Sequence, residues 1–263
     1  MLVLGFIFAF FIGITLGLVG SGGSILTVPV LVYILGVDPK LATTYSLFAI
    51  AISSFIGSIR NLFLKQVDLS KLLDFGLPSI IMVFLTRQFI LPLIPEEFQI
   101  GPWLIHQNVV LMVFFGLVML FSAWRMIGYT HTSEQDRAKE VPRYIMVLQG
   151  ALLGLITGVV GAGGGFLIIP ALVNFYHMSM LYAVSTSLAI ISLNSFFGLA
   201  GDLEKFHLFD WDVLGPYTSL LMLGMFVGFY VSRFFKSEQL KKGLGYLVLV
   251  IGLYVIIKEV VSF

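Results

Sequence analysis

The chain has 263 residues, of which 59% are hydrophobic and only 11% are charged, and its formal net charge is +1. Soluble domains carry about 25% charged residues, so this composition excludes a water-facing surface over most of the protein and indicates a chain embedded in lipid. The near-neutral charge argues against nucleic acid as a partner. The absence of cysteine excludes disulfides, thiolate zinc sites and iron–sulfur clusters.

Ten apolar segments are predicted along the chain, five in each half. A transmembrane helix needs about 20 apolar residues to cross the hydrocarbon. The segments of the first half cover residues 2–19, 24–36, 41–59, 75–94 and 103–127, and those of the second half cover 144–160, 166–176, 181–200, 213–235 and 244–257. Because 24–36 and 166–176 are too short to cross alone, we expect between eight and ten full crossings.

One glycine-rich stretch occurs twice. Residues 13–29 and 154–170 share the pattern Gly-x3-Gly-x2-Gly-x-Gly-Gly-x5-Pro. The same offset of 141 positions relates the Ala-x3-Ser-Leu patterns at 42–47 and 183–188, and no gap is needed from residue 13 to residue 57. A repeat of this length exceeds the periods of solenoids and indicates two homologous halves of a membrane protein.

The predicted organisation is a first transmembrane repeat at 1–127, a cytoplasmic linker at 128–143 and a second repeat at 144–263, joined in one membrane domain. Lys and Arg are concentrated in the loops 60–74, 125–143 and 233–242, which the positive-inside rule places in the cytoplasm. Matching segments of the two halves then end on opposite sides. The predicted fold class is an all-α polytopic membrane protein with two inverted-topology repeats of about five hydrophobic segments each, with short or broken helices after the glycine-rich turns.

Inverted repeats with short, glycine-interrupted segments at matching places are typical of transporters that bind their cargo near the bilayer midplane. A helix that begins inside the membrane has unpaired N–H groups and a partial positive charge at its first turn, and glycine lets a ligand approach them. We therefore predict a small anionic substrate held by Gly22, Gly23, Ser24, Gly163, Gly164 and Gly165. Close helix packing is the alternative, and we favour it for Gly13, Gly17, Gly20, Gly154, Gly158 and Gly161.

Polar residues in two matching segments extend the predicted site. Thr44 and Ser46 in the first half, and Ser185, Ser187 and Asn194 in the second, are expected to line the substrate path. The alternative is that these side chains serve helix packing or bond their own backbone.

Charged residues within the segments are few. Arg87 lies well inside the segment 75–94 and is a site candidate because intramembrane arginines are rare; the alternative is that it snorkels to the outer interface. Asp202 falls at a segment end and is expected to be solvated, so no carboxylate relay is predicted. No catalytic residues, metal ligands or cofactors are predicted.

These residues resemble the TauE/SafE family of sulfite and organosulfur anion exporters. The resemblance rests on the doubled Gly-x2-Gly-x-Gly-Gly-x5-Pro stretch, each copy followed by Ala-x3-Ser-Leu, and covers nearly the whole chain. It implies that residues 20–29 with 44–46, and 161–170 with 185–187, form the site. The first copy departs from the family pattern, because Thr44, Tyr45 and Ser46 stand where Gly-Thr-Ser or Ala-Thr-Ser is common and Ser24 stands where the second copy has Gly165.

The resulting hypothesis is a secondary transporter in the plasma (inner) membrane that exports sulfite, sulfoacetate or other sulfonates by alternating access. An anion channel, or a carrier for a different small organic anion, is the alternative. No nucleophile–base pair supports an enzyme. The expected partners are the small anion and the lipid bilayer, a homodimer is left open, and protonation of the cargo itself is one hypothesis for coupling.

Overall fold

A computed structural model of the chain describes residues 2–100, 103–128, 142–234 and 237–261. Within these residues, eight helical elements are long and apolar enough to cross a membrane, by length and composition. They are α1 (Leu2–Val19), α3 (Pro39–Phe63), the continuous element Leu69–Leu93, α7 (Gln107–Ile127), α8 (Arg143–Val160), α10 (Met180–Ala200), α11 (Trp211–Val231) and α12 (Ser237–Val261). The prediction of a polytopic helical membrane protein is confirmed, and its crossings number eight by this measure.

The element Leu69–Leu93 is not a uniform α-helix. It consists of α4 (Leu69–Lys71), α5 (Leu77–Leu85) and α6 (Leu91–Leu93), joined by the π-helical turns η2 (Leu72–Gly76) and η3 (Thr86–Ile90). The polar loop predicted before residue 75 is partly wrong, because the Asp68 side chain accepts a hydrogen bond from the backbone N–H of Lys71 and starts the helix there. Single π-helical turns often occur at functional sites, and η3 carries Arg87.

The two predicted short segments are present. The 3₁₀ helix η1 (Ser21–Leu26) continues into α2 (Thr27–Tyr33), and α9 (Gly165–Asn174) follows the second glycine turn. One expectation is wrong in detail: Gly22 and Gly23 lie inside η1 instead of preceding a helix that starts at Ser24.

Two further expectations are corrected around the fifth segment. Residues 103–106 belong to an antiparallel hairpin of β1 (Glu97–Ile100) and β2 (Trp103–His106), so α7 begins only at Gln107. The fold is therefore almost, but not entirely, helical; two short 3₁₀ helices, η5 (Leu203–Leu208) and η6 (Ser232–Phe234), complete it. Most of the predicted linker 128–143, namely residues 129–141, lies outside the described residues.

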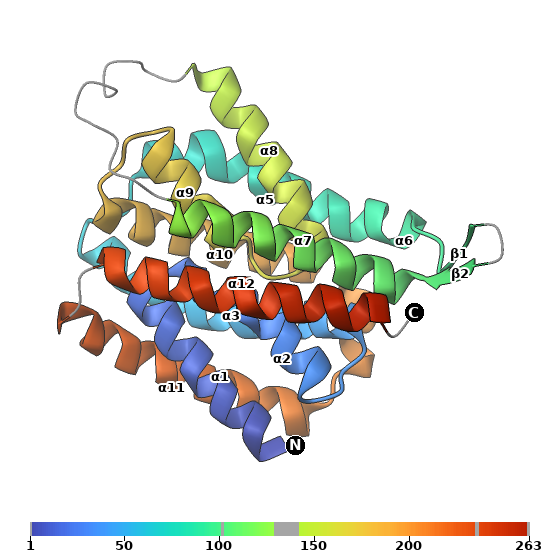
Figure 1. Cartoon of the computed structure of the whole chain (residues 1–263). Helices are drawn as coiled ribbons and strands as arrows, with labels where there is room; N and C mark the ends of the chain where they lie inside the picture. Colours follow the sequence, from blue (N-terminus) through green and yellow to red (C-terminus); the bar gives the residue numbers. More distant parts are fainter. Residues whose placement is uncertain (1, 101–102, 129–141, 235–236, 262–263) are drawn as a thin grey trace.

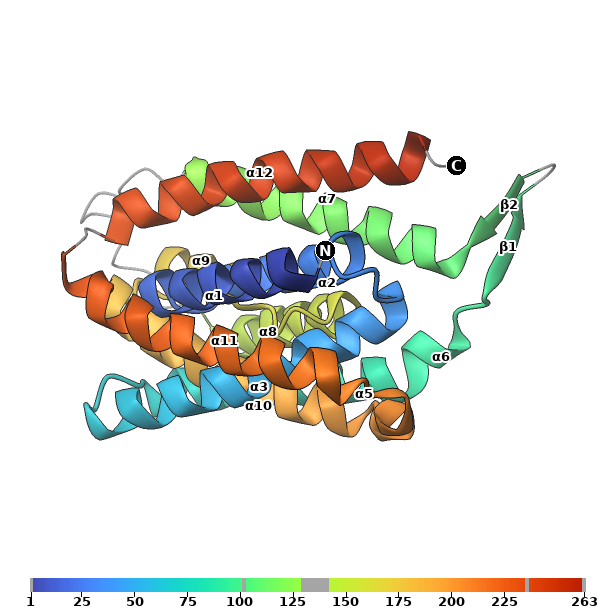
Figure 2. The same cartoon turned by 90° about the horizontal axis from the view of Figure 1, so that it is seen from below.

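Helices that are distant in sequence pack side by side. α1 packs against α11, α5 against α8, α3 against α10, α7 against α12, and η1 against α9. Figures 1 and 2 show the α7–α12 pair along one side of the bundle and the hairpin projecting from one end. At the repeat offset of 141 positions, α1 matches α8 and α5 matches α11. If the two repeats are exchanged, the pair α1–α11 becomes the pair α8–α5, so the set of pairs stays the same.

Glycines permit the closest of these approaches. A side chain at Gly13 would overlap the backbone carbonyl of Leu221 in α11, and one at Gly154 would overlap the backbone carbonyl of Ser79 in α5. Gly17 meets α11 in the same way, and Gly158 meets Thr86. Small residues at helix interfaces are typical of membrane bundles, and these contacts agree with the packing interpretation of this glycine set.

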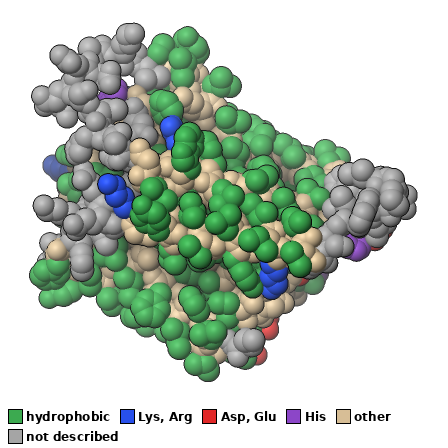
Figure 3. Space-filling view, in the orientation of Figure 1, with side chains coloured by type: hydrophobic (Ala, Val, Ile, Leu, Met, Phe, Trp, Pro, Cys, Tyr) green, Lys and Arg blue, Asp and Glu red, His purple; other side chains and the backbone are tan. Residues whose placement is uncertain are grey.

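The exterior is mostly apolar. Large hydrophobic side chains such as Phe11, Phe63, Leu117 and Tyr230 are exposed on several helices, and hydrophobic side chains dominate the face drawn in Figure 3. Exposed apolar surface of this extent is stable in lipid and not in water.

Candidate anion-binding site

Two buried charged residues, Arg87 and Asp202, form an ion pair. Arg87 belongs to η3, and Asp202 lies just beyond the end of α10. Arg87 Nη1 donates to Asp202 Oδ2 at 2.7 Å, and the two side chains are 0% and 1% exposed. Among the described residues, these are the two charged residues that are buried. The expectation that Asp202 is solvated is therefore wrong, and the burial of Arg87 argues against the alternative that it snorkels to the interface.

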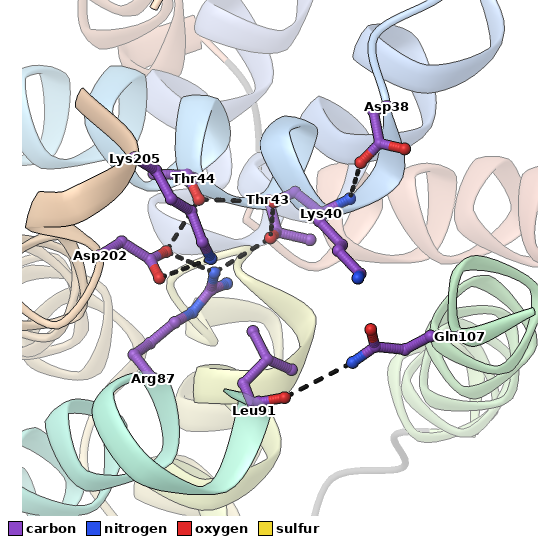
Figure 4. A network of polar contacts seen from close by, with 9 residues as sticks. All are labelled: Asp38, Lys40, Thr43, Thr44, Arg87, Leu91, Gln107, Asp202 and Lys205. Carbon is purple, nitrogen blue, oxygen red and sulfur yellow. Dashed lines mark hydrogen bonds and ion pairs between the residues drawn. The ribbon is translucent and has the colours of Figure 1, made fainter. Parts of the chain in front are cut away.

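Two threonines and a lysine complete the network, as Figure 4 shows. Arg87 Nη1 also donates to Thr43 Oγ1 at 3.0 Å, and Thr44 Oγ1 donates to Asp202 Oδ2 at 2.8 Å. Lys205 Nζ, on η5, donates to Asp202 Oδ1 at 2.7 Å, and its side chain is 31% exposed. The network thus joins the start of α3, the π-helical turn η3, the end of α10 and η5.

Positive charge exceeds negative charge in this network, since Arg87 and Lys205 face one carboxylate. Burial alone would raise the pKa of Asp202, but the charges of Arg87 and Lys205 and the hydrogen bonds from Lys205 and Thr44 outweigh it, so the pKa lies below its ordinary value. Asp202 is therefore ionised and the network carries one net positive charge. The two buried charges balance each other, and the additional positive charge is on the partly exposed Lys205, so the network as a whole attracts an anion.

One edge of the Arg87 guanidinium has no partner. Nε and Nη2 are buried and make no hydrogen bond within the described part of the chain, whereas Nη1 binds Asp202 and Thr43. Nη2 points at Gly161, where a side chain would overlap it. Two parallel N–H donors on one guanidinium edge match two oxygens of a carboxylate, phosphate or sulfonate. The free edge of Arg87 is therefore a candidate oxyanion site.

The second glycine turn, residues 161–164, lies beside this edge. Gly161, Gly163 and Gly164 have φ angles of 70°, 65° and 72°, which glycine adopts without strain. A side chain at Gly163 would lie 3.2 Å from Ile50 of α3 and 3.0 Å from Ser195 Oγ of α10. The turn therefore packs between α3 and α10, next to Arg87.

Ser46 shares the α3 face that meets this turn. Thr43 and Ile50 contact the turn at Gly161 and Gly163, and residues three and four apart on a helix lie on one side. The Ser46 hydroxyl and the Ser195 hydroxyl are both buried without a hydrogen-bond partner among the described residues. Together with the free edge of Arg87, these hydroxyls supply unused donors near the turn.

The other predicted site residues are placed differently. The missing side chains of Gly23 and Gly164 face Thr15 of α1 and Thr157 of α8, so these glycines pack on the preceding helices, and Gly22 faces Leu244 of α12. Their N–H groups remain predicted ligands. The rest are buried or begin α9: Ser24, Gly165, Ser185, Ser187, which donates to Val184 O, and Asn194, which donates to Ser79 Oγ.

The first glycine turn has a less polar setting. A side chain at Gly20 would meet Val184, whereas one at the matching Gly161 would meet Thr43 and Arg87. Gly17 packs against Gly228 of α11, whereas the matching Gly158 packs against Thr86. The buried charges therefore belong to one of the two turns. Sequence reasoning missed Thr43, Asp202 and Lys205, because nothing local marks them as neighbours of Arg87; Gly161 was included only through the family resemblance.

Comparison with known proteins agrees with this architecture. The family model described as sulfite exporter TauE/SafE matches residues 5–255. The chain belongs to the TauE/SafE family. This confirms the resemblance carried by the doubled glycine motif.

Relatives in this family include a "Probable membrane transporter protein" of Xylella fastidiosa (strain 9a5c), 28% identical over 93% of this chain and 91% of the relative. Others are MJ0441 of Methanocaldococcus jannaschii (27% identical, 73% and 69% covered) and YjnA of Bacillus subtilis (25% identical, 94% and 96% covered), which bear the same description. No solved structure matches the chain. The TauE/SafE chain is a multi-pass membrane transporter, and its family points away from an enzyme.

Proposed function

We propose that this protein exports small sulfur-containing anions, such as sulfite, sulfoacetate or other sulfonates, across the plasma membrane by alternating access. The observation that carries the proposal is the buried Arg87, whose Nε and Nη2 groups, beside the second glycine turn, have no hydrogen-bond partner in the described part of the chain. A sulfonate or sulfite accepts two hydrogen bonds there and balances the excess positive charge.

The chemistry of the site and the family contribute different parts of the proposal. A guanidinium edge recognises oxyanions in general, so the geometry supports an anion with at least two oxygens on one atom. The choice of sulfur anions rests on the family described as sulfite exporters.

The symmetry of the packing supports alternating access. Each helix pair maps onto a pair of the same set when the repeats are exchanged, as two inverted repeats around a shared site would require. The contacts of Gly20 with Val184 and of Gly161 with Thr43 are related by the same exchange. In this proposal the two short segments, η1–α2 and α9, meet at the centre and rock with their repeats.

Proteoliposomes test the transport claim directly. Vesicles containing purified protein and loaded with sulfite or sulfoacetate are expected to release the anion faster than protein-free vesicles, with saturation at high concentration. Competition between sulfite and sulfoacetate would show a shared site. Absence of flux for any small sulfur anion, in either direction and with folded protein, contradicts the proposal; single-channel currents would favour a channel instead.

A further inference from the structure

We propose that Asp202 binds a proton when an anion occupies the free edge of Arg87, so that proton binding and anion binding are linked. The proposal rests on the anion site of the proposed function and adds a proton that binds with the anion. It replaces the hypothesis that the cargo alone carries the proton, because the structure contains a buried carboxylate where none was expected.

In the proposed complex one guanidinium binds two anions. Asp202 Oδ2 binds Nη1 at 2.7 Å, and the other edge of the same group, Nε and Nη2, has no hydrogen-bond partner among the described residues. An anion bound to that edge is attracted by the positive charge that now stabilises Asp202, and it repels the carboxylate at short range in a buried setting. A bound anion therefore disfavours the ionised carboxylate relative to the neutral carboxyl, although Lys205 still pairs with Asp202.

Whether Asp202 can bind a proton depends on the groups that contact its carboxylate. From η3 the carboxylate meets Arg87, from α3 it meets the hydroxyl of Thr44, and from η5 it meets Lys205. Lys40, drawn nearby in Figure 4, is paired with Glu96 at 3.1 Å instead. Because the Lys205 side chain is 31% exposed, it can turn toward water, and it gives protons a route to Asp202.

Thermodynamic linkage determines how proton binding at Asp202 and anion binding at Arg87 affect each other. Without the anion, the pKa of Asp202 is held below its ordinary value and the carboxylate is ionised. With the anion bound, the pKa rises, so anion binding favours proton binding and, reciprocally, a protonated Asp202 binds the anion more tightly. Anion affinity is therefore highest at low pH and falls as the pH rises between the two pKa values of Asp202.

The repeat counterpart of Asp202, near the end of α3, is not a carboxylate. The residue that matches Asp202 at the repeat offset is Asn61, which is buried at 3% exposure and accepts from Arg60 Nη1 at 3.5 Å. An amide does not titrate in this range. The coupling site is thus single although the fold is doubled, which gives one proton for each anion.

The experiment measures binding of ethanesulfonate, whose charge is constant over the pH range used, to the full-length protein in detergent. For the wild type we expect the dissociation constant to rise with pH, by up to about tenfold per unit, at pH values between the lowered pKa of Asp202 in the anion-free protein and its raised pKa in the anion-bound protein. Asp202→Asn keeps the carbonyl oxygen that accepts from Arg87 and Thr44 and mimics the protonated acid. We expect it to bind tightly with no pH dependence.

Glu204→Gln is the matched control, since Glu204 is an exposed acid on η5, and it should behave as wild type. A second measurement needs no variant: adding ethanesulfonate to weakly buffered wild-type protein should remove protons from solution. Equal pH dependence in wild type and Asp202→Asn, loss of binding in folded Asp202→Asn, or no proton uptake by wild type would overturn the coupling. Failure of ethanesulfonate to bind wild type at any pH would instead count against the proposed function.

Discussion

Arg87→Lys is expected to abolish most anion binding while the protein remains folded. Lysine keeps a positive charge for Asp202, so the buried pair survives, but its ammonium cannot present the two parallel N–H donors of Nε and Nη2. Hydrogen bonds to charged groups contribute roughly 1.5–3 kcal/mol each, so losing one or two raises the dissociation constant by roughly 10- to 100-fold or more. Equilibrium binding of a sulfonate, alongside a thermal unfolding scan, measures both effects.

Arg60→Lys is the control for that substitution. Arg60 lies in the last turn of α3, whereas Thr43 and Thr44 of the Arg87 network lie near its start. Arg60 is exposed and lies over the ring of Phe229 at 4.8 Å. This variant should bind the anion as wild type does. If Arg87→Lys and Arg60→Lys both retain wild-type affinity, the free edge of Arg87 does not hold the substrate.

Asp202→Ala is expected to produce the largest loss of stability. The substitution leaves the guanidinium of Arg87 buried with Thr43 as its remaining partner, and uncompensated buried charges cost roughly 3–5 kcal/mol. Against total stabilities of about 5–15 kcal/mol for folded domains, this is a large fraction. Thermal unfolding in detergent, followed by circular dichroism, measures the change in the free energy of unfolding.

Breaking an exposed ion pair provides the comparison. Glu96→Ala removes the partner of Lys40, and the two side chains are 86% and 32% exposed, so the expected loss is below about 1 kcal/mol. Equal, small effects of Asp202→Ala and Glu96→Ala would mean that Arg87 relaxes into water, and the site as described would be wrong. A double variant, Asp202→Ala with Arg87→Met, should recover part of the stability because it removes the unpaired charge.

The glycines of the motif need a different kind of test from the one that the sequence suggests. From the sequence, valine at Gly23 or Gly164 is expected to block transport in a folded protein. In the structure these positions face Thr15 and Thr157 at close range, so valine would disturb the packing of the broken segments first. Substitutions at these two positions therefore cannot separate ligand binding from folding.

The sequence predicted the features that depend on the local order of apolar residues and glycines. Apolar windows located the eight long helices and the two short segments, and the spacing of Gly13 and Gly17 indicated helix packing. Helix ends were less certain, since the capping hydrogen bond of Asp68 and the strand pairing at 97–106 are not revealed by composition. The π-helical turn that holds Arg87 has no signature in the hydrophobic pattern.

The ion pair could not be predicted, for a physical reason. Arg87 and Asp202 are 115 positions apart and meet only because α5 and α10 pack together. Asp202 follows a hydrophobic segment within a run of acidic residues, which is the usual pattern of a solvated loop. In the structure its carboxylate is instead surrounded by Arg87, by Thr44 and by Lys205, which is three residues further on.

The most direct test of the central claim is a structure with a bound anion that can be identified by its own signal. Crystals grown with 2-bromoethanesulfonate allow the bromine to be located by anomalous scattering and the sulfonate to be placed beside it. We expect the sulfonate oxygens within hydrogen-bond distance of Arg87 Nε and Nη2, next to Gly161. Bromine density elsewhere, with the free edge of Arg87 unoccupied at saturating concentration, would contradict the account.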